Sequence, residues 1–520
     1  MMSLLSRATI VAAFSLTLSG CIGDGGTNTP YPFAPPPPSL HSIGGTVSGL
    51  TGTGLILQNY GLFDLLIDTD GAFVFSALQV NTSIYQVTVL NAPTEPAQTC
   101  LVTNGSGALS GADITNVDVT CKNILVSAAL SGNNIDGHSW TPSVSADGRY
   151  IAFTSEVSNL VEGDNNGTWD VFVRDTQTLI TTRISVDSAG HEADDGSFIP
   201  LISDDGRFVT FRSRATNLVP EDSNGIADVF IHDRQTGITT LESVSSSGNQ
   251  SNGDSAPYSI SGDGRYIAFK SEATNLVEMD SNGFKDAFLR DTQTGITSRI
   301  SRNSDGLGAD NDSFSPIISS NGRYVAYAST AANLIEGDTN DEEDIFVYDT
   351  QTQTTIRASV DSDGNEADDD NYDPAISADG RYIVFGSYST NLVSDDTNGE
   401  EDIFVFDSQT ATTTRVSISI EGTQREGSST AATISADGRF VTYVSNWQFS
   451  ATKWTGDIFV YDRQNSVTAQ VTREANSARV NWPFISDDGR YITFETNGDV
   501  GVNGSESDLS KVVVIRNPLF

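Results

Sequence analysis

Apolar and polar residues alternate in short runs along most of the chain, and turn residues separate the runs. Between residues 142 and 186 the pattern predicts four strands, over Pro142–Ser145, Arg149–Ser155, Trp169–Asp175 and Thr181–Val186. The first two runs are joined by Asp147-Gly148, a dipeptide typical of tight hairpin turns. We therefore expect this segment to form a four-stranded antiparallel meander.

The same pattern recurs along the chain, anchored each time by a Gly-Arg pair and an aromatic residue. Five successive intervals between these glycines are 58 residues long and the last is 51. Four short strands repeated seven times are the pattern of a β-propeller. We predict an all-β chain in which residues 123–520 form a seven-bladed propeller. The repeated glycines are Gly148, Gly206, Gly264, Gly322, Gly380, Gly438 and Gly489.

The seventh repeat has only three predicted strands, Trp482–Ser486, Arg490–Thr496 and Lys511–Arg516. The segment Ile124–Ala128 precedes the first repeat in the register of a fourth strand, since Val126 lies 16 residues before Pro142 as Ile184 does before Pro200. We expect this N-terminal segment to complete the last blade. Closure of that kind removes open sheet edges, which otherwise favour aggregation.

The repeat motif resembles a known family. The run Ser-x-Asp-Gly-Arg-aromatic-x-x-Phe, as in Ser145–Phe153, precedes an Asp-x-Phe-Val-x-Asp strand, as in Asp170–Asp175. Together they resemble propeller repeats of the TolB type and the WD40-like repeats of bacterial secreted proteins. The resemblance implies a fold but no activity, because such repeats occur in binding scaffolds, peptidase gates and sensors. TolB-type peptidases add a catalytic α/β domain after the propeller, and no Gly-x-Ser-x-Gly elbow followed by such a domain is present here.

Residues 43–122 are expected to form a separate small β-sandwich, because six short runs of strand-forming residues alternate with turns. Its start, Gly44–Gly49, resembles prealbumin-like and Ig-like modules of bacterial surface proteins, which implies a spacer. The predicted strands are Gly54–Tyr60, Phe63–Asp68, Ala72–Ser76, Ser83–Leu90, Thr99–Thr103 and Val117–Cys121.

The N-terminus predicts export and a lipid anchor. Residues 1–20 carry one cation, Arg7, and then an apolar run too short for a comfortable membrane span. Leu18-Ser19-Gly20-Cys21 resembles a bacterial lipobox, which implies cleavage before Cys21 and its lipidation; an ordinary signal peptide is the alternative. Ile22 in place of Asp implies, by resemblance to enterobacterial lipoproteins, the outer membrane. Residues 21–42, rich in Pro and Gly, are predicted to be a tether.

Once Cys21 is assigned to lipid, the chain has two further cysteines, Cys100 and Cys121. An oxidising envelope compartment predicts a disulfide between them, and two buried thiols are the alternative. The four histidines are scattered, so a zinc site is not expected. The chain has 28 basic and 68 acidic residues, and the resulting net charge of −40 argues against a nucleic-acid partner.

Five loops between the predicted second and third strands share Asp, Asn two residues later and Asp six residues later. Oxygen ligands around a Gly turn resemble the first half of an EF-hand loop, so these loops are candidate calcium sites of weak affinity. The alternative is an Asx turn that only joins two strands. The candidate ligands are Asp164, Asn166 and Asp170; Asp222, Asn224 and Asp228; Asp280, Asn282 and Asp286; Asp338, Asn340 and Asp344; and Asp396, Asn398 and Asp402.

The arginines of the Asp-Gly-Arg turns occur in every repeat. A ring of ligand-binding arginines is one interpretation, but a functional site normally breaks such symmetry, so we expect each to pair with a nearby acid. In a meander the loops between second and third strands share a face with the acidic connections between blades. Much of the negative charge is therefore expected on that face, where it favours solvation or a cationic partner.

Two functions fit these features. The first is a non-enzymatic, lipid-anchored scaffold that presents a propeller face to a protein or polysaccharide in the bacterial envelope. The second is a glycan-active hydrolase or lyase that uses acids at the propeller centre. A repeat that departs from the others would favour the second, and repeat six does so with Trp447, Phe449, Lys453 and Trp454 in place of the acidic loop.

Overall fold

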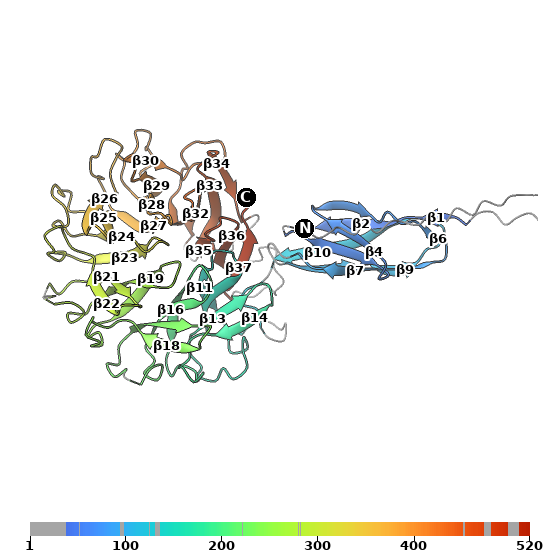
Figure 1. Cartoon of the computed structure of the whole chain (residues 1–520). Coiled ribbons are helices and arrows are strands. Elements are labelled where there is room, and N and C mark those ends of the chain that lie inside the picture. Colours follow the sequence, from blue (N-terminus) through green and yellow to red (C-terminus); the bar gives the residue numbers. More distant parts are fainter. Residues whose placement is uncertain are drawn as a thin grey trace, which may run out of the picture.

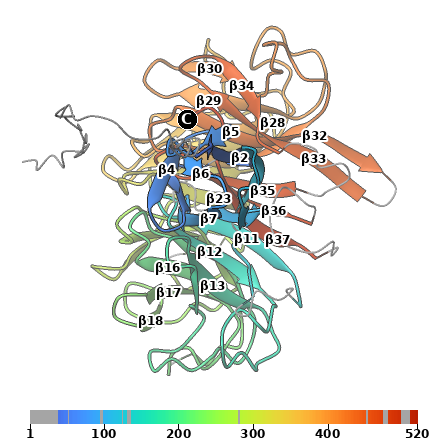
Figure 2. The ribbon, with the colours of Figure 1, turned by 90° about the vertical axis from the view of Figure 1, so that its right-hand side faces the viewer.

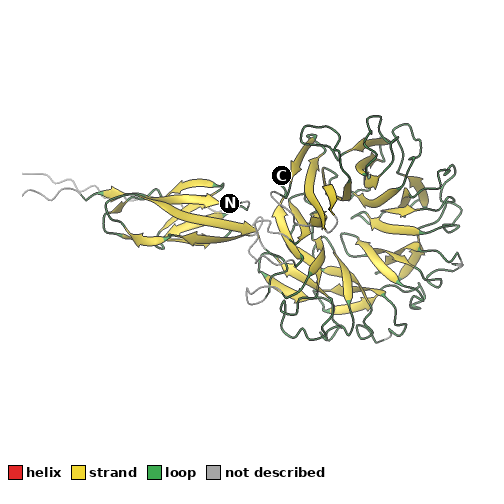
Figure 3. Cartoon of the chain, turned by 180° about the vertical axis from the view of Figure 1, so that it is seen from behind, coloured by secondary structure: helices red, strands yellow, loops and turns green. Residues whose placement is uncertain are grey.

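The computed structural model describes residues 38–520 except 51, 94–97, 124, 130–135, 221, 279, 281, 451–452, 473–479 and 498–508. The predicted signal peptide, Cys21 and most of the predicted tether lie outside the described residues. The described chain consists of strands, turns and loops (Figure 3). Within it, no helix has the length and apolar character needed to cross a membrane.

The N-terminal unit is a sandwich of two four-stranded sheets with strand orders β5-β2-β10-β8 and β4-β3-β7-β9, joined by a short β1-β6 pair. Ile43, Leu55 and Val117 are fully buried between the sheets, which explains the alternation along their strands. The six predicted strands are confirmed as β3, β4, β5, β7, β8 and β10, whereas β1, β2, β6 and β9 were not predicted. The bounds are β1 (Leu40–His41), β2 (Ile43–Ser48), β3 (Leu55–Asn59), β4 (Phe63–Ile67), β5 (Gly71–Val74), β6 (Gln79–Val80), β7 (Ile84–Asn91), β8 (Gln98–Thr103), β9 (Ser106–Ala108) and β10 (Ile114–Asn123).

The predicted disulfide is formed. Cys100 on β8 lies directly opposite Cys121 on β10, and their sulfur atoms are bonded. The bond therefore staples an edge strand to the centre of its sheet. Beyond Cys121, β10 continues as far as Asn123, where Asn123 pairs with Gln98.

The rest of the chain folds into seven successive sheets arranged around one axis (Figure 1). Six have four antiparallel strands and the last has three. Their strands are β11 (Ser139–Val144), β12 (Tyr150–Ser155), β13 (Asp170–Asp175) and β14 (Ile180–Arg183); β15 (Ser197–Ile202), β16 (Phe208–Ser213), β17 (Asp228–Asp233) and β18 (Ile238–Leu241); β19 (Ser255–Ile260), β20 (Tyr266–Ser271), β21 (Asp286–Asp291) and β22 (Ile296–Arg299); β23 (Ser313–Ile318), β24 (Tyr324–Ser329), β25 (Asp344–Asp349) and β26 (Thr354–Arg357); β27 (Asn371–Ile376), β28 (Tyr382–Ser387), β29 (Asp402–Asp407) and β30 (Thr412–Arg415); β31 (Ser429–Ile434), β32 (Phe440–Ser450), β33 (Lys453–Asp462) and β34 (Val467–Gln470); and β35 (Val480–Ile485), β36 (Tyr491–Thr496) and β37 (Lys511–Arg516).

The repeated motif forms a tight turn, and its polar residues form hydrogen bonds or ion pairs within the same sheet. Ser145 Oγ donates to Asp147, which accepts the Arg149 N–H at 3.0 Å, and Ser145 Oγ accepts the Tyr150 N–H at 3.0 Å. Gly148 completes the turn with a φ of 73°. The turn thereby places the Arg149 side chain over β13, where Nε and Nη2 grip Asp175 in a bidentate pair at 3.1 and 2.8 Å.

Six of the seven turn arginines pair in this way with the aspartate that ends the third strand of the same sheet. The expectation of local pairing is confirmed for those six: Arg149–Asp175, Arg207–Asp233, Arg265–Asp291, Arg323–Asp349, Arg381–Asp407 and Arg439–Asp462. The hydrogen bonds from Arg323 hold the pKa of Asp349 at about 2. Arg490 differs, since it lies 3.7 Å from Asp488 and over the Phe520 ring.

The same turn joins neighbouring sheets, because its glycine packs against the aromatic residue of the preceding motif. A Cβ on Gly206 would collide with the Tyr150 ring, and one on Gly148 would collide with the ring of Tyr491 in the last sheet. The contact between Gly148 and Tyr491 therefore joins the first sheet to the last, and the ring is closed. The remaining pairs are Gly264 on Phe208, Gly322 on Tyr266, Gly380 on Tyr324, Gly438 on Tyr382 and Gly489 on Phe440.

The N-terminal closing segment takes the predicted register. The Val126 N–H donates to Val512 O at 2.9 Å, as that of Ile184 does to Val171 O, and Leu125 bridges Val513 as Arg183 pairs with Phe172. Of the predicted strand over Ile124–Ala128, the described residues form a single bridge at Leu125 and then a turn. The residues that correspond to the start of β14, Lys122 and Asn123, belong instead to β10 of the sandwich.

This closure predicts the effect of two truncations. A chain that begins at residue 129 lacks the segment that covers β37, whereas a chain that begins at residue 123 keeps it. We expect the shorter chain to melt at a lower temperature and to self-associate through the exposed strand edge. Differential scanning fluorimetry and analytical ultracentrifugation measure both effects. If the two chains melt alike and are both monomeric, the segment does not close the ring.

Candidate functional site

Two regions on the loop face carry the candidate chemistry. The loop face is the face that holds the loops between second and third strands and the connections between sheets. The first region consists of the five loops predicted to bind calcium. The second surrounds the axis, where the innermost strands begin, and we call it the axial site.

Each calcium-candidate loop is an Asx turn. In the first loop, Asn166 Oδ1 accepts the Thr168 N–H at 3.2 Å, and Asn166 Nδ2 donates to Asp170 at 2.8 Å and to Ala193 O at 3.1 Å. The asparagine therefore ties its loop to the connection that leads into the next sheet. The corresponding turns at Asn224, Asn282, Asn340 and Asn398 have the same pattern.

In four of these loops an arginine from the fourth strand lies among the carboxylates. Arg183 Nη1 is 3.4 Å from Asp164, 3.7 Å from Asp170 and 2.8 Å from Glu192. Asp170 is fully buried, and burial raises its pKa to about 6 although Ser185 and Asn166 donate hydrogen bonds to it. The corresponding arginines are Arg299, Arg357 and Arg415.

In the second loop an amide, not a cation, donates to the carboxylates. Leu241 replaces the arginine, and Gln250 Nε2 donates to Asp222 at 2.8 Å and to Asp228 at 2.9 Å. Protein donors thus already serve the carboxylates in all five loops. Calcium at these loops stays a prediction, and an ion there would have to displace a guanidinium or an amide.

The axial site begins with aromatic residues of the first two sheets. Trp140, the second residue of β11, stacks on Trp169 with ring centroids 4.4 Å apart, and Trp169 lies 6.3 Å from Phe198 of β15. Trp140 is 38% exposed. Because Trp140 and Phe198 hold the same register position on neighbouring innermost strands, the three rings form one arc beside the axis.

The next sheets add cations to this arc. Lys270 Nζ lies 5.6 Å from the centroid of the Tyr258 ring and 5.7 Å from that of Phe314. Arg212 pairs with Asp254 at 3.3 Å, so its charge is partly neutralised. The lysine held between two rings is the kind of cation–π contact that orients an ammonium group without removing it from solvent.

The fourth and fifth sheets make the opposite part of the arc acidic. Glu343 precedes β25 and Glu401 precedes β29, at the position that Trp169 occupies before β13. Burial, followed by the charges of Asp370 and Asp373, raises the pKa of Glu343 to about 7. Burial, followed by the charges of Asp373 and Asp402, raises the pKa of Glu401 to about 8. A carboxyl that keeps its proton near neutrality can donate a hydrogen bond or a proton.

The neighbours of Glu401 are adapted to it. A Cβ on Gly386 would lie 2.5 Å from Glu401 Oε1, and the equivalent positions in other sheets carry side chains such as Thr154 and Lys270. Tyr372 and Tyr388 meet edge to face, with centroids 6.1 Å apart. The glycine therefore leaves room for the carboxyl, and Tyr388 lies beside it.

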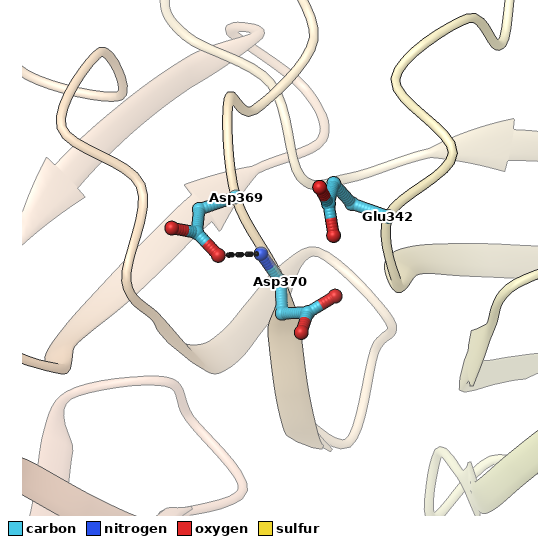
Figure 4. Close-up of side chains that lie close together, drawn as sticks. All are labelled: Glu342, Asp369 and Asp370. Carbon is cyan, nitrogen blue, oxygen red and sulfur yellow. Dashed lines mark hydrogen bonds between the residues drawn. The ribbon is translucent and has the colours of Figure 1, made fainter.

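Three further carboxylates lie at the edge of this acidic part. Glu342, Asp369 and Asp370 bring ligand oxygens within 4.8 Å of one another (Figure 4). Asp370 Oδ1 accepts the Glu343 N–H at 2.9 Å, and Asp370 Oδ2 accepts the Tyr372 hydroxyl at 2.7 Å. Among the described residues this is the group of three carboxylates close enough together to share a hard cation. Glu342 lies within the fourth predicted loop, but none of the three is a predicted ligand.

Repeat six departs from the others as expected, but in its backbone. β32 and β33 are longer than the corresponding strands of the other sheets, and they extend as a hairpin in which Phe449 pairs with Trp454 (Figure 2). The side chains of Trp447, Phe449, Lys453 and Trp454 are outside the described part of the structure.

The sequence predictions did not include Trp140, Trp169, Glu343 or Glu401. The signal was present in the repeats, because these residues stand where symmetry between repeats is broken. At the position before the third-strand Asp, the first five repeats carry Trp169, Ala227, Lys285, Glu343 and Glu401. Alignment of the repeats against one another would have found them.

No family model and no curated protein matches this chain. Solved structures do: oligogalacturonate lyase in complex with manganese is 12% identical and covers 85% of this chain and 99% of its own, with a TM-score of 0.47. A putative TolB from Agrobacterium tumefaciens is 16% identical, covers 54% and 80%, and scores 0.34. TolB from Acinetobacter baumannii is 13% identical, covers 71% and 80%, and scores 0.35. TolB proteins, whose repeats the motif resembles, are thus among the matching structures.

The loop contacts predict a graded response to substitution. Arg183→Leu leaves buried Asp164 and Asp170 without their cation and should lower the free energy of unfolding by about 3–5 kcal/mol. Arg183→Leu combined with Glu192→Gln recreates the second loop and should recover part of that loss. Urea denaturation measures both changes; equal stability of Arg183→Leu and the wild type would show that the arginine is dispensable.

The same variant tests calcium. Arg183 occupies the space between the carboxylates and offsets one of their charges. About 5 mM calcium should therefore raise the melting temperature of Arg183→Leu more than that of the wild type. Thermal scans in calcium and in chelator make the comparison. A rise in the wild type as large as in the variant would instead show that the ion binds beside the arginine.

Glu401 predicts a specific pH dependence of stability. Its folded-state pKa is about 8 against an ordinary value of 4.5, so the stability it contributes is complete below pH 4.5 and is lost as the pH rises towards 8. Glu401→Gln stays neutral and should unfold like the wild type at pH 4.5 but be more stable at pH 8.5, by an amount on the order of 1–3 kcal/mol. The exposed neighbour Glu400→Gln is the control and should keep the wild-type slope. A wild-type slope in Glu401→Gln would contradict the shift.

Proposed function

We propose that this chain is a lipid-anchored protein of the bacterial envelope, held in the outer membrane through Cys21, that binds a polysaccharide at its axial site. The stacked pair Trp140 and Trp169 carries the proposal. An exposed indole supplies a flat apolar surface of the kind on which the C–H face of a sugar ring packs, at a small cost in conformational entropy.

The rest of the axial site suits the polar side of the same ligand. Glu343 and Glu401 supply carboxyl oxygens that accept hydrogen bonds from sugar hydroxyls, and the protonated form of either can also donate. Lys270 adds a cation on the other side of the arc. The net charge of −40 makes a nucleic acid an unfavourable occupant, so a glycan is preferred.

A second candidate function is glycan hydrolysis or elimination, favoured by the raised pKa values of Glu343 and Glu401. Glycoside hydrolysis uses one protonated and one ionised carboxyl, and both residues lie beside the further carboxyl of Asp373. In this case Glu401→Gln should keep polysaccharide binding and lose turnover, which separates the two functions.

Affinity electrophoresis against a panel of neutral and acidic polysaccharides tests the proposal. Trp140→Ala should weaken binding by roughly tenfold or more, as removal of an aromatic contact residue does. Phe284→Ala is the matched control, because Phe284 is also 38% exposed but lies in the loop of the third sheet. If Trp140→Ala and Phe284→Ala bind every polysaccharide as the wild type does, the axial site is not the binding site.

A further inference from the structure

One end of the sandwich carries a concentration of exposed apolar side chains. They come from β1, from the turn between β3 and β4, and from the segment that runs through β6 into β7. We call this group the sandwich tip. Its members and their exposed fractions are Leu40 54%, Tyr60 49%, Leu62 74%, Leu78 55%, Val80 43% and Ile84 55%.

Backbone pairing brings these segments to the same end. Leu40 pairs with Val80, and the Tyr60 N–H donates to Gln86 O at 2.8 Å, two residues after Ile84. The tip therefore lies at the start of β7, with β1 and β6 beside it (Figure 1). Exposed apolar residues that occur singly need no explanation, but six at one end of a small domain indicate a contact surface.

The chain enters the sandwich at this tip and leaves it at the other end. Residues 38–41 lead into β1, whereas β10 begins at Ile114, opposite Ile43, and ends at Asn123. Ten residues of strand span about 33 Å. The tip is therefore the part of the folded chain closest in sequence to Cys21, with 16 residues between Cys21 and residue 38, a reach of roughly 50 Å.

The tip is also free of charge. Residues 22–121 contain no Lys or Arg. The two carboxylates at its border are already bonded, Asp64 to Gln58 Nε2 at 2.7 Å and Asp113 to the Ser42 N–H at 2.7 Å. His41, beside Leu40, lies 3.6 Å from Asp113. The surface thus has no Lys or Arg to attract anionic lipid, and the carboxylates at its border have partners within the sandwich.

We propose that the sandwich tip inserts into the surface of the lipid bilayer in which Cys21 is anchored. This inference rests on the proposed lipid anchor. The tether delivers the tip to the membrane, and the apolar side chains provide a second, weaker attachment beside the acyl chains. With the tip in the bilayer surface, the sandwich stands with its other end, where the propeller begins, away from the lipid.

Vesicle flotation of the chain that begins at Ile22, which has neither the apolar run of residues 1–20 nor the lipid on Cys21, tests the tip alone. We expect binding to phosphatidylcholine vesicles, and weaker binding when phosphatidylglycerol is added, because the chain is strongly acidic. Leu62→Ser with Leu78→Ser should lower the vesicle-bound fraction by roughly tenfold or more. Leu101→Ser is the matched control, because Leu101 is 67% exposed on β8 but is not part of the tip.

A second measurement keeps the test valid if the double variant Leu62→Ser with Leu78→Ser does not fold. The tryptophan fluorescence of Leu62→Trp in the same chain from Ile22 should be quenched by brominated phosphatidylcholine more than that of the parent chain. No flotation of the parent, an equal loss in Leu101→Ser, or quenching of Leu62→Trp no greater than that of the parent would overturn the inference. The anchor is tested separately in cells by incorporation of labelled palmitate, which Cys21→Ala should abolish; labelling that persists would refute lipidation at Cys21 and would leave the vesicle result intact.

Discussion

The contact between the glycine of each Asp-Gly-Arg turn and the aromatic ring of the preceding sheet is the constraint on which the propeller depends. A side chain on Gly148 or Gly206 would collide with that ring, so the sheets can approach only where glycine stands. The arginine of the same turn forms a bidentate ion pair with an aspartate on the third strand of its own sheet, and so joins the turn to that strand. One short motif therefore fixes both the fold of each sheet and the packing of each sheet on the next.

This repeated scaffold leaves function to the positions at which the repeats differ. The turn arginines and the Asx loops occur in nearly every sheet, and their charges are satisfied within the protein. The axial site, by contrast, carries indoles in the first sheet and carboxyls before the third strands of the fourth and fifth. A symmetric frame with an asymmetric centre is the arrangement expected when rigidity and recognition are assigned to separate residues.

The sandwich separates two kinds of surface along the chain. Its tip is apolar and uncharged where the tether enters, and its last strand leads from the other end into a propeller that carries most of the acidic residues. The disulfide between Cys100 and Cys121 holds the edge of that last strand's sheet. The structure therefore shows which end of the predicted spacer the chain enters and which end leads into the propeller.

The sequence alone determined the all-β fold, the strands of each repeat and the register of Val126, because strand alternation and a 58-residue period are local signals that tertiary contacts do not override here. It also predicted the Cys100–Cys121 pair, with two buried thiols as the alternative, and the structure contains the disulfide. Only the tertiary structure decided that Arg183 fills the first acidic loop, that Gly386 makes room for Glu401, and that Leu125 forms a single bridge to β37 while β10 extends to Asn123. Each of these depends on atoms brought together from separate strands, and the spacing of residues along one strand does not encode such distances.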